Sequence, residues 1–121
     1  IIGDEEMMRS SLAAIREAGL DVPLPLRYTA ERNASHFIWE EKVFLHNYEG
    51  NTAWTHMGPL FIKWLQHLDK ELAAEYRPQY AELIEKHGGF VEGFFSDGKP
   101  YRSWCYYADH SMLWACNWLT L

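Results

Sequence analysis

The chain has 121 residues, a formal net charge of −6 at pH 7, 48% hydrophobic residues and 16% aromatic residues. This length is usual for one globular domain. The negative charge disfavours nucleic acid and acidic membrane surfaces as partners, and no apolar run reaches the roughly 18 residues of a membrane-spanning helix. The many Trp and Tyr side chains fill a core or form flat platforms for sugar rings.

The N-terminal part carries clear helix signals. Asp4 is followed by acidic residues and then by apolar residues at helical spacing, and Gly19 is well placed to end the helix. We therefore expect a helix over 4–18. Two prolines within 20–26 exclude a helix there and predict an extended connection.

The middle of the chain is less uniform. Residues 30–46 have an ambiguous pattern, and a helix around 36–45 is one interpretation. An apolar stripe over 52–68 predicts a helix. Because Pro59 interrupts this stripe early, either the first turn is bent or the helix proper begins near Gly58.

The C-terminal part combines helix and turn signals. A helix is predicted over 77–87, with Pro78 in its first turn. Residues 90–104 contain Ser-Asp-Gly between two extended runs and predict a short β-hairpin. A last helix is expected over 109–121, and Asp109 is better explained as its N-cap than as a catalytic acid. Apolar residues surround this helix on nearly every side, so we expect it to be buried all round by parts of a larger protein.

Two polar and aromatic segments could carry chemistry. Residues 47–56 place amide, hydroxyl and aromatic groups at a helix entrance, which suits a polyol, although an ordinary capped helix with Trp54 buried is the alternative. Glu92 stands alone among Gly and aromatic residues. A carboxylate in a cleft wall of that kind suits proton chemistry, whereas on a strand it could simply face water.

Histidine and cysteine spacing argues against a metal site. The six histidines form no close pair of the HxxxH or HxH type, and we expect no metal and no cofactor. Cys105 and Cys116 fit no common zinc pattern and make no disulfide framework. They favour a reduced, cytoplasmic protein.

The order of these segments resembles that of the six-hairpin (α/α)6-barrel glycosidases, most closely the glycoside hydrolase family 63-like α-glucosidases. The run from Tyr48 to Trp54 is similar to the entrance of a late hairpin in that family. The Gly-Phe segment around Glu92, the Asp-Gly-Lys-Pro run at 97–100 and a Trp-rich last helix follow in the same order. The resemblance covers residues 47–121.

The resemblance implies an all-α fold, with residues 1–121 forming a single segment, the C-terminal portion of an (α/α)6 toroid whose sugar site lies in a central funnel. Glu92 matches the family's catalytic base, which activates water in an inverting hydrolysis of an α-glucoside or related sugar. The general acid would lie upstream, outside this chain. The expected partners are a carbohydrate substrate and the upstream remainder of the barrel. The expected sugar contacts are Tyr48, Asn51, Trp54, His56 and Trp104.

The sequence departs from the family at two places. Thr55 and His56 stand where the family has two prolines, and the last helix lacks the usual run of small residues. These departures leave two alternatives open. One is a non-catalytic carbohydrate-binding or helical scaffold segment, and the other is a sugar epimerase or polysaccharide lyase on the same toroid.

Overall fold

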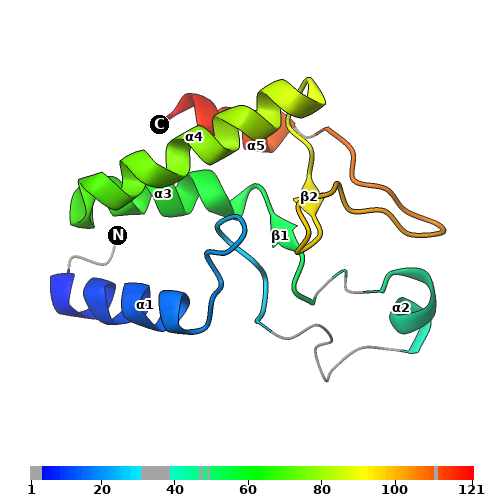
Figure 1. The fold of residues 1–121 in the computed structure, drawn as a ribbon, viewed down its shortest axis with the longest axis horizontal. Coiled ribbons are helices and arrows are strands. Elements are labelled where there is room, and N and C mark those ends of the chain that lie inside the picture. The colour runs from blue at the N-terminus through cyan, green and yellow to red at the C-terminus, as the bar shows by residue number, and fades with distance from the viewer. Residues whose placement is uncertain (1–3, 31–38, 47, 49, 111) are drawn as a thin grey trace.

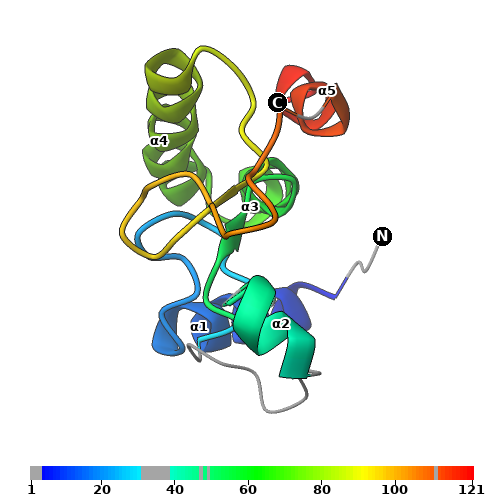
Figure 2. The ribbon, with the colours of Figure 1, turned by 90° about the vertical axis from the view of Figure 1, so that its right-hand side faces the viewer.

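The computed structural model describes residues 4–30, 39–46, 48, 50–110 and 112–121. Within these residues the chain is mostly helical, with one small antiparallel sheet of two strands. Figure 2 shows α3 in the centre, with α4 and α5 on one side of it and α1 on the other. The elements in chain order (Figure 1) are α1 (Glu5–Glu17), α2 (Trp39–Phe44), β1 (Ala53–Trp54), α3 (Met57–Leu68), α4 (Lys70–His87), β2 (Gly93–Phe94) and α5 (Met112–Leu119).

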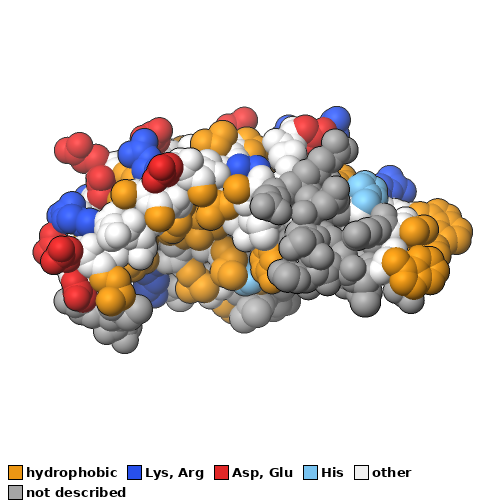
Figure 3. All heavy atoms as spheres, turned by 90° about the horizontal axis from the view of Figure 1, so that it is seen from below, with side chains coloured by type: hydrophobic (Ala, Val, Ile, Leu, Met, Phe, Trp, Pro, Cys, Tyr) orange, Lys and Arg blue, Asp and Glu red, His pale blue; other side chains and the backbone are white. Residues whose placement is uncertain are grey.

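Helix α1 begins and ends where its capping residues predict. The Asp4 side chain accepts a hydrogen bond from the Met7 N–H at 3.1 Å, and Gly19 follows the helix with a φ of 63°. The expected helix over 4–18 is therefore confirmed to within a residue. An apolar groove separates α1 from α3, and hydrophobic side chains gather there on the face seen in Figure 3. Its lining includes Met8, Ile15, Leu60 and Phe61.

Helices α3 and α4 form a hairpin around Asp69. The Asp69 side chain accepts a hydrogen bond from the Leu72 N–H at 3.0 Å, so α4 begins at Lys70. The expected start at 77 is wrong, and Pro78 lies inside the helix. Pro78 is exposed, and the cost of its missing N–H is offset by the packing of the long helix against α3.

The core lies between α3 and α4. A Cβ on Gly58 would lie 1.7 Å from the Tyr80 hydroxyl oxygen, so only glycine permits this approach of the two helices. The Tyr80 hydroxyl donates a hydrogen bond to the Pro25 carbonyl, which ties the extended segment to α4. The buried side chains of the two helices are Phe61, Ile62, Leu65, Leu72, Ala73, Tyr76 and Tyr80.

The small sheet joins two distant parts of the chain. Ala53 pairs with Phe94 and Trp54 with Gly93. The expected hairpin within 90–104 is present as a chain reversal, because an antiparallel bridge joins Phe94 to Pro100 and the N–H groups of Phe95 and Tyr101 donate to the Lys99 and Gly93 carbonyls at 2.8 and 2.7 Å. The ladder partner of β2, however, is β1. The expected helix over 52–68 is wrong at its start, since β1 precedes α3; the alternative start near Gly58 is correct to one residue.

The two remaining helices are shorter than expected. Helix α2 covers Trp39–Phe44, and positions 36–38 of the expected helix lie outside the described residues. Helix α5 begins at Met112, so Asp109 is not its N-cap; the Asp109 side chain accepts a hydrogen bond from the His110 N–H at 2.7 Å instead. Leu119 of α5 is 79% exposed in this chain, so the expected burial of the helix on every side by parts of a larger protein stays a prediction. No helix among the described residues is long and apolar enough to span a bilayer.

Candidate functional site

Two neighbouring segments hold the backbone of Glu92. The Glu92 N–H donates to the Asp109 carbonyl at 2.9 Å, and the Glu92 carbonyl accepts from the Thr55 N–H at 3.1 Å. The Thr55 hydroxyl lies 3.0 Å from the same carbonyl and 2.6 Å from that of Val91. Glu92 is therefore fixed between the residue that leads into α3 and the residue that leads toward α5.

The Glu92 side chain has a defined partner. It is half-buried, and its carboxylate accepts a hydrogen bond from the Tyr106 hydroxyl. Burial raises the pKa of Tyr106, and the hydrogen bond and the charge of Glu92 raise it further. The phenol therefore stays protonated near neutral pH and remains a donor to the carboxylate.

Aromatic rings meet nearly at right angles beside this carboxylate. The Tyr48 ring contacts Trp54 with centroids 4.7 Å apart at 80°, and it contacts Tyr106 at 5.4 Å and 88°. The Trp54 indole N–H donates to the Tyr48 carbonyl at 3.2 Å. Edge-to-face pairs of this kind are stabilising, and they hold the rings in place. Tyr101, with a ring centroid 5.6 Å from that of Tyr48, completes the group, and we call Tyr48, Trp54, Tyr101 and Tyr106 the aromatic cluster.

The His56 ring contacts Trp54, which also contacts Tyr48. Its imidazole stacks on Trp114 at 5.1 Å and 20°, and its Nδ1 is buried with no hydrogen-bond partner among the described residues. Burial lowers the pKa of His56, and the negative charge of Glu92 opposes this shift with a smaller effect. His56 is therefore a neutral imidazole near pH 7, in the electrostatic range of Glu92.

The structure brings together four of the six expected site residues. Tyr48, Trp54 and His56 surround the entrance to α3, and Glu92 lies across the sheet from them. The other two lie elsewhere. Asn51 is half-buried in the loop before β1, and none of the ring contacts or hydrogen bonds found around Glu92 among the described residues involves it.

Trp104 also lies outside this group. It is 85% exposed and stacks on Phe44 of α2, with centroids 5.5 Å apart and planes at 25°. Its position in the chain, two residues before Tyr106, nevertheless keeps it on the same loop as the partner of Glu92.

Sequence reasoning missed Tyr106, Tyr101 and Trp114. The aromatic residues in 101–107 were a usable signal, because such density in a short loop is unusual for solvent-exposed chain. No local pattern, however, says that a tyrosine hydroxyl will reach a carboxylate 14 residues earlier. This pairing depends on the loop folding back between Tyr101 and Ala108.

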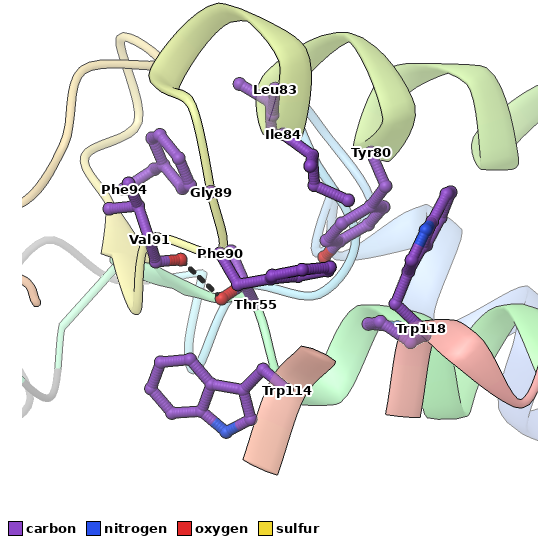
Figure 4. Close-up of a pocket in the computed structure, with 11 residues that line it drawn as sticks. Thr55, Tyr80, Leu83, Ile84, Gly89, Phe90, Val91, Phe94, Trp114 and Trp118 are labelled. Atoms are coloured by element: carbon purple, nitrogen blue, oxygen red, sulfur yellow. Dashed lines mark hydrogen bonds between the residues drawn. The ribbon is translucent and has the colours of Figure 1, made fainter. Parts of the chain in front are cut away.

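A narrow apolar crevice adjoins the site between α4, α5 and the sheet (Figure 4). Thr55 is one of the few polar side chains in its lining, and its hydroxyl already donates to the Val91 carbonyl. Thr55 and Trp114 belong both to this crevice and to the surroundings of Glu92 or His56. The crevice therefore provides an apolar surface next to the site, and its lining residues supply no further catalytic group. Its other lining residues include Tyr80, Ile84, Phe90 and Trp118.

No group of three or more His, Cys, Asp or Glu side chains in the described part of the chain is arranged to hold a metal ion. Both cysteines are exposed free thiols. No protein-family model, curated protein or solved structure matches the chain. Functional inference therefore depends on the carboxylate, its phenol donor and the rings around them.

Proposed function

We propose that this chain is part of an (α/α)-barrel glycoside hydrolase that acts on an α-glucoside or related sugar with inversion, and that Glu92 is its catalytic base. The observation that carries this proposal is the half-buried Glu92 carboxylate, bonded to the Tyr106 phenol at the edge of the aromatic cluster. Sugar sites combine a few polar groups of fixed orientation with aromatic faces. Trp54 and Tyr101 are buried, at 8% and 1% exposed, so the half-buried Tyr48 and Tyr106 are the rings of the cluster that remain accessible.

The chemistry assigned to Glu92 is removal of a proton from water. The water oxygen attacks the anomeric carbon while Glu92 takes the proton, and a carboxylic acid on the other face of the sugar protonates the leaving oxygen. In an inverting enzyme the two carboxyl groups are about 6.5–9.5 Å apart, which leaves room for the water. We assign the acid to a part of the barrel that is not in this chain.

Tyr106 has a positioning role in this proposal. Its hydroxyl donates to one carboxylate oxygen and leaves the other oxygen of Glu92 to accept the proton of water. A phenol whose pKa is raised does not compete as a base. Tyr106 thus orients the carboxylate and leaves one of its oxygens open.

The barrel itself is supported by apolar surface that this chain leaves uncovered. Leu119 on α5 is 79% exposed, and Leu60 on α3 is 49% exposed beside the apolar groove. Helices that pack against both faces, as in a toroid of alternating inner and outer helices, would bury these side chains. A non-catalytic helical scaffold would need the same covering, so this surface supports the architecture and not the chemistry.

A sugar epimerase is the second candidate, and His56 favours it. Proton transfer at a sugar carbon needs an acid and a base, and a neutral imidazole lies within the electrostatic range of Glu92. The two reactions differ in what they release. Hydrolysis produces a free reducing sugar from a glycoside, whereas epimerisation in deuterated water places deuterium on a sugar carbon without breaking a glycosidic bond.

The deciding experiment is Glu92→Gln in the full-length protein, assayed on a panel of α-glucosides. Loss of the base should lower kcat by about 10²–10⁴-fold. Sugar affinity, measured by calorimetry with glucose, should change little because the amide keeps the size of the carboxylate and its oxygen can still accept a hydrogen bond from Tyr106. Unchanged turnover in Glu92→Gln would reject the proposed base, and parallel loss of turnover and affinity would point to a structural role.

A further inference from the structure

An isolated antiparallel bridge ties the backbone around Glu92 to the segment that precedes α5. Val91 pairs with His110 in this bridge, and the Glu92 N–H donates to the Asp109 carbonyl at 2.9 Å. A bridge of this kind has fewer hydrogen bonds than a ladder of strands, so local opening costs less free energy there than in the helical core. The position of Glu92 therefore depends on whatever keeps this bridge closed.

Two histidines lie where α4, β2 and the bridge meet. The His110 ring packs directly on the backbone of Gly89, because a Cβ on that glycine would lie 2.4 Å from the imidazole Nδ1. His87 is in the last turn of α4, two residues before Gly89, and its ring contacts Phe94 of β2 with centroids 5.4 Å apart. Its Nε2 is buried with no hydrogen-bond partner among the described residues. We call His87 and His110 the histidine pair.

The surroundings of His87 suit a neutral imidazole. Burial lowers the pKa of His87, and the charges of Lys86 on its own helix and of His110 on the facing segment lower it further. The Asp109 carboxylate accepts the His110 N–H at 2.7 Å and is not among the groups that shift the pKa of His87. Protonation of the pair therefore places two like charges together without a carboxylate that offsets the charge on His87.

We propose that the histidine pair is an acid-sensitive switch, which keeps the bridge at Val91 and His110 closed while its rings are neutral and opens the bridge when they become charged. Histidine is the side chain whose ordinary change of charge falls between pH 5 and pH 8. The pair thus lets a modest fall in pH release the backbone of Glu92 while the α3–α4 hairpin stays folded. The switch itself does not depend on the proposed hydrolase function, whereas its effect on turnover does.

The test is hydrogen exchange of the full-length protein at pH 7.5 and pH 5, followed by mass spectrometry and corrected for the intrinsic exchange rate at each pH. The peptide that contains the Glu92 amide should lose about tenfold in protection on acidification, the effect of one pKa unit in one group. The peptide that contains the core residue Leu65 should lose clearly less. His87→Phe, which keeps a ring against Phe94, should abolish the loss at Glu92.

Two further variants separate the pair from general acid sensitivity. His110→Gln removes one of the two like charges, so the loss of protection at Glu92 should become smaller without disappearing, because burial of His87 remains. His67→Gln is the matched control, since His67 is exposed on α3, and it should behave as the parent. If His87→Phe does not give the parent circular dichroism at pH 7.5, His110→Gln alone decides the test.

Equal protection of the Glu92 peptide at both pH values would overturn the switch. So would a fall of the same size in His110→Gln as in the parent, or an equal fall in the Leu65 peptide, which would mean that the whole fold opens. Turnover of an α-glucoside should fall over the same pH range in the parent and less steeply in His110→Gln. If no α-glucoside is turned over while the exchange follows pH as expected, the proposed function fails and the switch stands.

Discussion

The Tyr106 hydroxyl donates a hydrogen bond to the Glu92 carboxylate across 14 residues of chain. Tyr106 also contacts the Tyr48 ring edge-to-face, so the donor cannot swing away without breaking an aromatic contact. The backbone of Glu92 is held by Thr55 and Asp109. Carboxylate and donor are consequently positioned by different segments. The geometry of the site therefore depends on how those segments pack.

Tyr106→Phe should lower kcat of the full-length protein about tenfold and change KM little. The phenyl ring keeps the contact with Tyr48, and only the hydrogen bond that orients Glu92 is lost, a charged bond of about 1.5–3 kcal/mol. Steady-state kinetics on an α-glucoside is the measurement. Tyr28→Phe is the matched control, because Tyr28 is 53% exposed and is not part of the aromatic cluster. Equal effects of the two variants would remove the positioning role of Tyr106.

Gly58→Ala should destabilise the α3–α4 hairpin strongly. The new Cβ would lie 1.7 Å from the Tyr80 hydroxyl oxygen and 2.4 Å from the Pro25 carbonyl oxygen, and both groups are already bonded to each other. Overpacking of this kind costs about 1–3 kcal/mol or more. The free energy of unfolding in urea measures the effect. Gly93→Ala, whose Cβ would meet its nearest neighbour at 3.5 Å, should cost far less; a similar loss in both variants would contradict the close packing at Gly58.

Tyr76→Phe should lower the free energy of unfolding by about 1.5–3 kcal/mol, the usual worth of a hydrogen bond to a charged group. The Tyr76 hydroxyl donates to the buried Asp21 carboxylate at 2.5 Å, and the Arg16 guanidinium is 3.8 Å from the same oxygen. Without the phenol, the carboxylate loses its best partner while remaining 7% exposed. Tyr76→Phe combined with Asp21→Asn should lose less than the sum of the single variants, and strict additivity would show that the two groups are not coupled.

The elements that could be predicted from the sequence are those with signals inside the element. Asp4 and Gly19 mark the ends of α1, and the apolar stripe marks α3. The predicted helix over 77–87 is shorter than α4 because Pro78 favours the first turn of a helix, although Asp69 is also a good N-cap. An exposed proline within a long packed helix removes only one hydrogen bond, and tertiary packing outweighs this loss.

The candidate site was only half predictable, for a physical reason. The Gly and aromatic residues around Glu92 singled it out, and Trp54 was marked by its place at a helix entrance. Their proximity depends on β1 pairing with β2 across about 40 residues, as Ala53 with Phe94 shows. A turn signal predicts that the chain reverses, as Gly98 does with a φ of 78°, but it does not say which strand will be the partner.

Acidification should destabilise the packing of the C-terminal segment through His56 and His87. Burial lowers the pKa of both histidines from their ordinary value of 6.5. The charges of Lys86 and His110 lower that of His87 further, whereas the charge of Glu92 partly opposes the shift in His56. As pH falls below about 6.5, His56 and His87 therefore bind protons more readily in the unfolded chain than in the folded one. The stability that the two neutral imidazoles contribute is complete above that pH and is lost as pH falls through their lower pKa values in the folded state.

The measurement is the free energy of unfolding in urea between pH 7.5 and pH 5. His56→Phe keeps a ring against Trp114, and His87→Phe keeps one against Phe94, so both should remain folded at neutral pH. Each should show a smaller loss of stability on acidification than the parent chain, because a group that must charge on unfolding has been removed. His67→Phe, at an exposed position on α3, should follow the parent curve. Parallel curves for all three variants would mean that neither buried imidazole controls the acid sensitivity of the fold.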